Sequence, residues 1–160
     1  MLEYIFNIFI TLLIIFPLTI FIHELGHAFF LKIFKIPFNK IILGIGKELF
    51  SINKIQINTY YFLGGGCDYS LTNRVHWFKY FLFSFGGILF NIISVCLVYY
   101  FSKDILFHSD SFLSNISLLF ILISSVSILN ILPLRFTIFG KKMTFDGYNM
   151  FVQPQNKALK

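Results

Sequence analysis

The sequence is short of charge. Only 12% of its 160 residues are charged, and seven residues are acidic. A folded domain this small must keep a large polar surface in water, and so few charges cannot cover one. The mean hydropathy is +0.78 and 57% of the residues are hydrophobic, which excludes a disordered chain. We therefore expect a single membrane-embedded domain, residues 1–160, whose first partner is the lipid bilayer.

Cysteine is also scarce, and the basic residues are not gathered as in a nucleic-acid-binding protein. Of the two cysteines, Cys96 lies inside an apolar run, so a disulfide framework is not expected. The net charge is +6, but most basic residues fall in two blocks that flank apolar runs. Such blocks are typical of juxtamembrane anchors. We therefore expect no nucleic acid among the partners.

Three apolar segments are long enough to cross a bilayer. They cover about residues 4–31, 77–101 and 112–132, and each reaches the roughly 20 residues that a transmembrane helix needs. The first segment does not resemble a cleaved signal peptide, because it carries Glu3 in place of a basic leader and its apolar stretch is too long. The sequence thus predicts a mainly α-helical, polytopic membrane protein with about three transmembrane helices.

The distribution of basic residues predicts the orientation of these spans. Six basic residues lie between the first and second spans and five follow the third, whereas only Lys103 lies between the second and third. The positive-inside rule then places the first connection and the tail in the cytoplasm. We expect a multi-pass protein of a bacterial cell membrane, with its N-terminus outside.

The first connection predicts a small membrane-associated β-sheet over about residues 40–66. Residues 55–60 alternate apolar and polar side chains, the pattern of a half-buried strand. Residues 51–54 are expected to form the turn before this strand. The glycines at 64–66 are expected to end it, because glycine permits positive φ.

The chemistry of the chain is concentrated in His23-Glu24-Leu25-Gly26-His27, an HExxH pattern inside the first span. Residues i and i+4 share one face of a helix, so both imidazoles can bind one metal ion. Glu24 can then act as a general base toward water. A glutamate inside the membrane costs several kcal/mol unless it is paired or solvated, so it indicates function. The structural alternative is that the histidines bond neighbouring helices and Glu24 pairs with a lysine.

A zinc site needs a third protein ligand, and the sequence offers few candidates. His76 lies where the second span begins, whereas His108 and two of the aspartates fall on the predicted outer side. On the cytoplasmic side, Asp68 lies in the first connection and Asp146 lies in the tail.

Several motifs together resemble the site-2 protease family of intramembrane zinc metalloproteases, over about residues 16–150. The HExxH motif is the most specific of them, and the Gly-containing strand region 38–69 is similar to the family's membrane-associated strands. Residues 87–91 (GILFN) match its G-P-x-x-N element, with Ile88 in place of proline.

Two further elements extend the resemblance toward the C-terminus. Asn130-Ile131-Leu132-Pro133 matches the family's N-x-x-P element, and Asp146-Gly147 matches its D-G element, whose aspartate is the third zinc ligand. About eight additional residues, near 135–142, separate these two elements in this chain compared with the compact form of the family.

The resemblance implies a zinc metalloprotease. His23, His27 and Asp146 would hold Zn²⁺, and Glu24 would be the catalytic base. The substrate would be a membrane-spanning protein or peptide, received as an added strand along residues 40–63. The site would open toward the cytoplasm, and substrate choice would come from the membrane core or a regulatory membrane partner.

The resemblance also gives Asn91 and Asn130 roles near the active site, orienting backbone or substrate. As polar residues at the ends of apolar runs, both also fit helix caps or interhelical hydrogen bonds. Asp146 alone also fits a turn before Gly147, although the resemblance favours the ligand role.

Two other functions fit the same residues. A catalytically inactive membrane relative would bind a partner without cleaving it, although the intact HExxH motif argues against this. A small metal or proton transport component would use His23, Glu24 and His27 to carry the ion.

Overall fold

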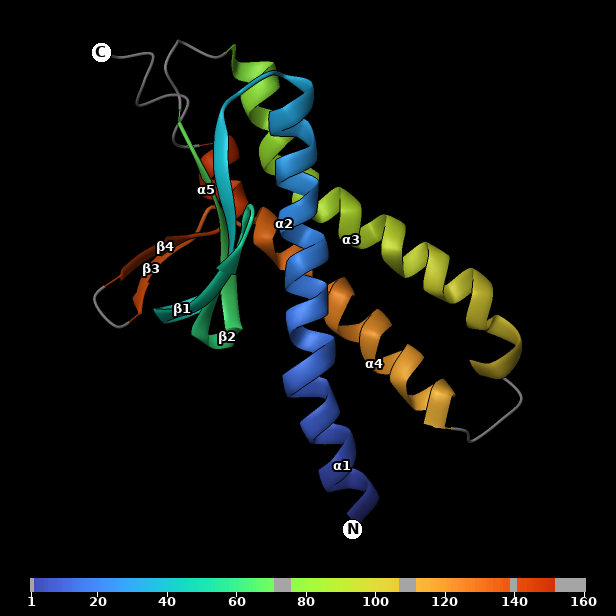
Figure 1. The fold of residues 1–160 in the computed structure, drawn as a ribbon. Coiled ribbons are helices and arrows are strands. Elements are labelled where there is room, and N and C mark those ends of the chain that lie inside the picture. Colours follow the sequence, from blue (N-terminus) through green and yellow to red (C-terminus); the bar gives the residue numbers. More distant parts are fainter. Residues whose placement is uncertain (1, 71–75, 107–111, 139–140, 152–160) are drawn as a thin grey trace.

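A computed structural model describes residues 2–70, 76–106, 112–138 and 141–151 (Figure 1). Within these ranges, three helical segments are long and apolar enough to cross a membrane: Ile5–Ile33, Trp77–Leu106 and Phe112–Ile131. The prediction of a mainly helical protein with three spans is confirmed, and the helices begin and end within a few residues of the expected positions.

The first span consists of α1 (Leu2–Ile10), a π-helical turn η1 (Thr11–Ile15) and α2 (Phe16–Ile33). Pro17 lies in the first turn of α2, where it has no N–H to donate to the preceding turn. The wider π-helical turn directly before it accommodates this loss. The sequence of α2 that follows carries the HExxH motif.

Glycines bring α2 and α3 (Trp77–Leu106) into close contact. A Cβ on Gly26 would collide with the carbonyl oxygen of Gly86, and a Cβ on Gly86 would lie 2.6 Å from the carbonyl oxygen of Gly26. Small residues at such crossings let the backbones of membrane helices approach. α4 (Phe112–Val126) returns alongside α3 and continues as the 3-10 turn η2 (Ser127–Ile131) (Figure 1).

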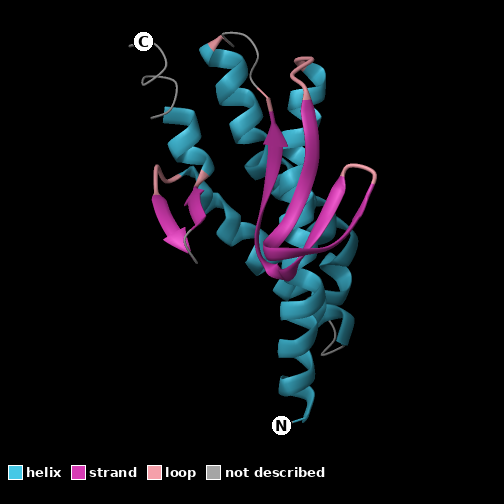
Figure 2. Ribbon diagram, turned by 60° about the vertical axis from the view of Figure 1, so that its left-hand side comes forward, coloured by secondary structure: helices cyan, strands magenta, loops and turns pink. Residues whose placement is uncertain are grey.

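The predicted sheet is confirmed as an antiparallel hairpin of β1 (Phe38–Ile52) and β2 (Ile55–Tyr69) (Figure 2). Its turn holds Asn53 at φ 52°. The hairpin is irregular, because residues 41–43 of β1 pair with 65–67 of β2 on one side and with 55–57 on the other. The end of β2, from Gly65 to Tyr69, pairs with β1 along one side, and no strand among the described residues pairs with its other side.

The expectation that the glycines at 64–66 end the strand is wrong. β2 continues through them, with Gly65 opposite Leu43 and Gly66 opposite Ile42. A Cβ on Gly65 would lie 2.6 Å from Ile20 Cγ2 and 3.1 Å from Glu24 Oε1. The missing side chain is needed so that β2 can pass directly against α2 at Glu24.

A second hairpin, which the sequence analysis did not predict, lies between the third span and Asp146. It consists of β3 (Arg135–Ile138) and β4 (Lys141–Thr144), paired from Arg135 opposite Thr144 to the tip. The hairpin contains the additional residues noted in the sequence. It returns the chain to the beginning of β3, where Thr144 lies opposite Arg135. There α5 (Asp146–Phe151) packs against α3 and η2, with Met150 fully buried.

The buried core lies where the helices meet the first hairpin. One cluster, around Leu31, Tyr80 and Phe83, joins α2 to α3. A second cluster of Ala28, Ile41 and Leu43 joins α2 to β1. The HExxH motif lies at this junction, directly before Ala28 of the second cluster.

Candidate metal centre

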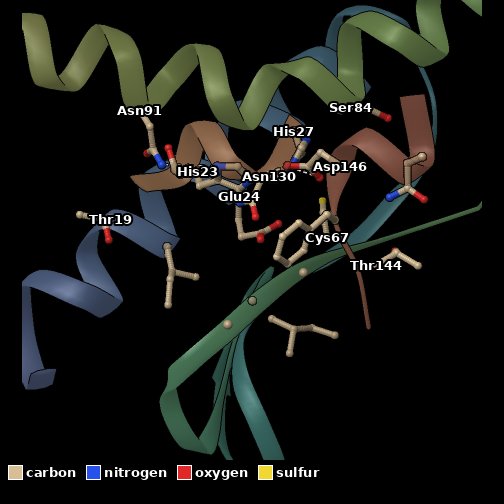
Figure 3. A pocket seen from close by; sticks show the side chains of 18 of the residues that line it. Thr19, His23, Glu24, His27, Cys67, Ser84, Asn91, Asn130, Thr144 and Asp146 are labelled. Carbon is tan, nitrogen blue, oxygen red and sulfur yellow. Dashed lines mark hydrogen bonds and ion pairs between the residues drawn. The ribbon is translucent and has the colours of Figure 1, made fainter. Parts of the chain in front are cut away.

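His23, His27 and Asp146 converge on one point, as Figure 3 shows. His23 Nε2 lies 2.8 Å from Asp146 Oδ2, and His27 Nε2 lies 3.2 Å from Asp146 Oδ1. The three ligand atoms all lie within 4.8 Å of one another. Two imidazole nitrogens and one carboxylate oxygen form a donor set typical of a catalytic zinc site.

The helical spacing of α2 brings both histidines and Glu24 to this point. The two imidazole rings are in contact edge to face, with centroids 4.9 Å apart. Glu24 is buried between α2 and β2, and its Oε2 has no hydrogen-bond partner within the described residues. The structural alternative is present in one of its two halves. The histidines do bond a neighbouring helix, α3, at Phe83 and Asn91, but Glu24 forms no ion pair with a lysine among the described residues. A buried carboxylate oxygen without a partner is costly and is expected at a functional site.

Asp146 reaches the histidines because the β3–β4 hairpin returns the chain and α5 begins with this residue. Burial opposes ionisation of its carboxyl group, but the adjacent His27 and His23 outweigh burial and hold the pKa of Asp146 well below its ordinary value. Asp146 is therefore a carboxylate at neutral pH, the form that binds a metal ion.

Gly87 of α3 leaves space at the two ligand nitrogens. A Cβ on this residue would lie 2.5 Å from His23 Nε2 and 2.6 Å from His27 Nε2. Any other residue would fill the volume beside both Nε2 atoms. This space and the donor set together fit a metal ion of the size and preferences of Zn²⁺.

A backbone carbonyl of α3 orients His27. The Nδ1–H of this imidazole donates to the carbonyl oxygen of Phe83 at 2.7 Å. A histidine with its proton on Nδ1 keeps the lone pair of Nε2 for a metal ion. The carbonyl of Phe83 thus holds His27 in the tautomer that a metal site requires.

The two predicted asparagines both lie at this site. Asn91 of α3 is only 2% exposed, and its Nδ2 lies 3.4 Å from His23 Nδ1. Asn130 of η2 lines the same cavity as the metal-binding side chains.

The other candidates for the third ligand lie away from it. His76 is exposed, and its Nδ1 accepts the backbone N–H of Phe78 at 3.3 Å. Asp68 is also exposed and accepts a hydrogen bond from Asn39. His108 lies outside the described residues.

A cavity of about 870 Å³ surrounds the cluster. Its walls come from the helices α2, α3, α4 and α5, from η2, and from both hairpins. Arg135 stands at the hairpin side, with its guanidinium 5.8 Å from the ring centroid of Tyr148, and both residues line the cavity. The volume is typical of sites that enclose a ligand of several hundred daltons or a short peptide segment.

The sequence analysis missed three contributors to this site: the space at Gly87, the Phe83 carbonyl and the hairpin wall. The Gly86-Gly87 pair signalled a close helix contact but not which side chains it would face. For the hairpin, the signal was Gly140 shortly after Arg135–Ile138, whose phenylalanine, threonine and isoleucine favour a strand.

No protein-family model matches the chain. A similar protein is the uncharacterized membrane protein YwmF of Bacillus subtilis, 36% identical over 83 residues. The aligned segment is 52% of each chain, so the chain spans about half the length of this relative. This chain, too, is a membrane protein. Its apolar helices and its similarity to a membrane protein both support this conclusion. Neither indicates an activity.

Gly87→Ala is expected to weaken zinc binding tenfold or more. The magnitude is based on the roughly 10–100-fold loss of metal affinity that follows mutation of residues that only bond the metal ligands. The added methyl group would lie against both Nε2 atoms, whereas alanine is otherwise favourable in a helix. The measurement is the zinc dissociation constant of the detergent-purified protein, by competition with a chelator. Gly66→Ala is the matched control, because nothing lies within 4 Å of its Cβ position. Equal affinities for both variants would remove the proposed role of this space.

Proposed function

We propose that the protein is an intramembrane zinc metalloprotease that cleaves a membrane-spanning or membrane-associated peptide. The observation that carries the proposal is the position of Glu24. Its unpartnered carboxylate oxygen lies beside a buried His–His–Asp cluster, inside a segment that is apolar enough to cross the bilayer. The resemblance of the HExxH, N-x-x-P and D-G elements to site-2 proteases supports the same reaction class.

In this proposal His23, His27 and Asp146 hold the ion, and Glu24 handles the proton. Bound zinc supplies Lewis-acid polarisation of the scissile carbonyl and acidifies a water molecule. Glu24 Oε2 has no competing partner, so it can accept a proton as the water oxygen attacks the carbonyl carbon. Glu24 then donates that proton to the departing amine as the C–N bond breaks.

The end of β2 is the proposed receiving edge for the substrate. A transmembrane helix shields its own peptide bonds, so the substrate must be extended before it is cleaved. Residues 65–69 of β2 pair with β1 along one side and with no other strand of the described part of the chain, and Gly65 lies against Glu24. A peptide that adds as a strand here would pass beside the proposed general base. This edge lies a few residues beyond the predicted 40–63 range.

The proposed orientation follows from the charges around the site. The HExxH motif ends five residues before Lys32, and the connection between the first and second spans is basic, so we place this end of α2 in the cytoplasm and the N-terminus outside. Water would then reach Glu24 from the cytoplasmic side through the cavity.

A comparison of membrane proteomes tests the proposal. Cells that produce the wild type are expected to contain a cleaved fragment that is missing from cells with Glu24→Gln, where its precursor accumulates. Identical proteomes, combined with zinc or proton flux in proteoliposomes of the wild type, would favour a transport component instead.

A further inference from the structure

Helix α3 presents one stripe of residues to the histidine pair. Phe83, Gly87 and Asn91 are spaced by four residues and therefore lie on one face of the helix. The carbonyl of Phe83 bonds His27 and Gly87 leaves space at both Nε2 atoms. Asn91 reaches His23 from the other end of the stripe (Figure 3). The two histidines are thus matched with opposite ends of the same stripe.

The amide of Asn91 is incompletely satisfied. Its Nδ2 faces His23 Nδ1 at 3.4 Å, which is longer than an ordinary hydrogen bond. Its Oδ1 has no partner within the described residues, although the residue is 2% exposed. Buried amide oxygens in native proteins are nearly always bonded, so the arrangement calls for a partner for this oxygen.

Metal binding to His23 determines whether the Asn91 atom that faces it must be a hydrogen-bond donor or an acceptor. A neutral imidazole that gives its Nε2 lone pair to a metal carries its proton on Nδ1, which is then a donor. An amide N–H₂ facing that N–H would set one donor against another. An amide oxygen in the same place would accept the proton.

We infer that Asn91 is a positioning residue for the metal centre, with its Oδ1 accepting the Nδ1–H of His23. The inference rests on the proposed metal site. A half-turn of the amide exchanges two atoms of nearly equal size and brings Oδ1 to the position facing Nδ1. The N–H₂ group then takes the former buried place of Oδ1, on a residue that lines the cavity. Asn91 thereby fixes His23 in the tautomer with its proton on Nδ1, as the Phe83 carbonyl fixes His27.

This role differs from orienting substrate or backbone, because it predicts an effect on the metal itself. Bonds from outer partners fix the ring plane and raise the basicity of a ligating histidine, and their loss weakens metal binding by roughly 10–100-fold. A substrate-orienting residue would change cleavage and leave the affinity for zinc unchanged.

The experiment compares zinc dissociation constants of three purified full-length proteins: wild type, Asn91→Leu and Asn91→Asp. Leucine has a similar volume but no acceptor, so Asn91→Leu should bind zinc about 10–100-fold more weakly. Aspartate keeps an acceptor at the same position, so Asn91→Asp should bind at least as tightly as the wild type. The absorption spectrum of the cobalt-substituted protein should change in Asn91→Leu and be preserved in Asn91→Asp.

Ser94→Ala is the matched control. Its Oγ–H donates to the backbone carbonyl of Asn91 at 2.8 Å, so this variant changes the same turn without touching the amide. Its zinc affinity should equal that of the wild type.

Two results would overturn the role of Asn91. One is a wild-type affinity for zinc in Asn91→Leu, whether or not cleavage is lost, and the other is weaker binding in Asn91→Asp than in Asn91→Leu. A wild type that binds no zinc would overturn the proposed metal centre itself, which separates the two failures.

Discussion

Purified Glu24→Gln should bind zinc like the wild type and cleave its substrate about 10²- to 10⁴-fold more slowly, the range that general acid–base groups contribute. Glutamine fits the same space between α2 and Gly65 of β2. Its amide cannot accept a proton from water at neutral pH. The loss should therefore appear in turnover and not in metal content.

The measurement uses the precursor identified by the proteome comparison, reconstituted with the enzyme in lipid vesicles. Zinc per chain is determined on the same samples by elemental analysis. Glu48→Gln is the matched control, since Glu48 is exposed and lies 4.0 Å from Lys40, away from the cluster. Turnover by Glu24→Gln at the wild-type rate would remove Glu24 from its role and with it the proposed mechanism.

The second large effect is expected from Asp146→Ala, which should lower zinc affinity by more than about 100-fold, because outer partners alone contribute 10–100-fold. It removes one of three donors from the cluster and leaves His23 and His27 facing each other without a carboxylate. The dissociation constant measures this loss, and cleavage should disappear with the metal.

Asp68→Ala is the matched control. Asp68 is exposed and lies away from the cluster, so its loss should leave zinc affinity unchanged. Asp146→Asn adds a test of charge. The neighbouring histidines hold the pKa of Asp146 well below its ordinary value, so the native group is ionised at neutral pH and substitution by asparagine removes its charge. Unchanged zinc binding in Asp146→Ala would mean that a different residue supplies the third ligand.

Local patterns in the sequence were enough to predict the helices, the first hairpin and the His23–Glu24–His27 group. Each of these depends on periodicity or spacing within a few residues, which the chain displays directly. Asp146 lies 123 residues from His23, so its place beside the histidines was expected only through the resemblance to a family. Spacing and elimination left His76 and Asp68 open beside it.

The errors and omissions share a physical cause: they depend on contacts between distant segments. The glycines at 64–66 looked like the end of a strand because their local preference allows it, yet Gly65 serves the packing of β2 against Ile20 and Glu24. Likewise, Gly87 and Asn91 gain their positions from the crossing of α2 and α3. The sequence of α3 alone does not reveal which helix it will cross.

The return of the chain through the β3–β4 hairpin sets an order of assembly during synthesis. Because His23 and Asp146 are 123 residues apart, the ribosome makes the carboxylate roughly 6 to 25 s after the first histidine, at about 5–20 residues per second. A nascent chain holds His23, Glu24 and His27 throughout that interval without their third partner. The candidate metal centre is therefore complete only once α5 has been made and has docked against α3, so the proposed protease would gain its activity at the last step of its own synthesis.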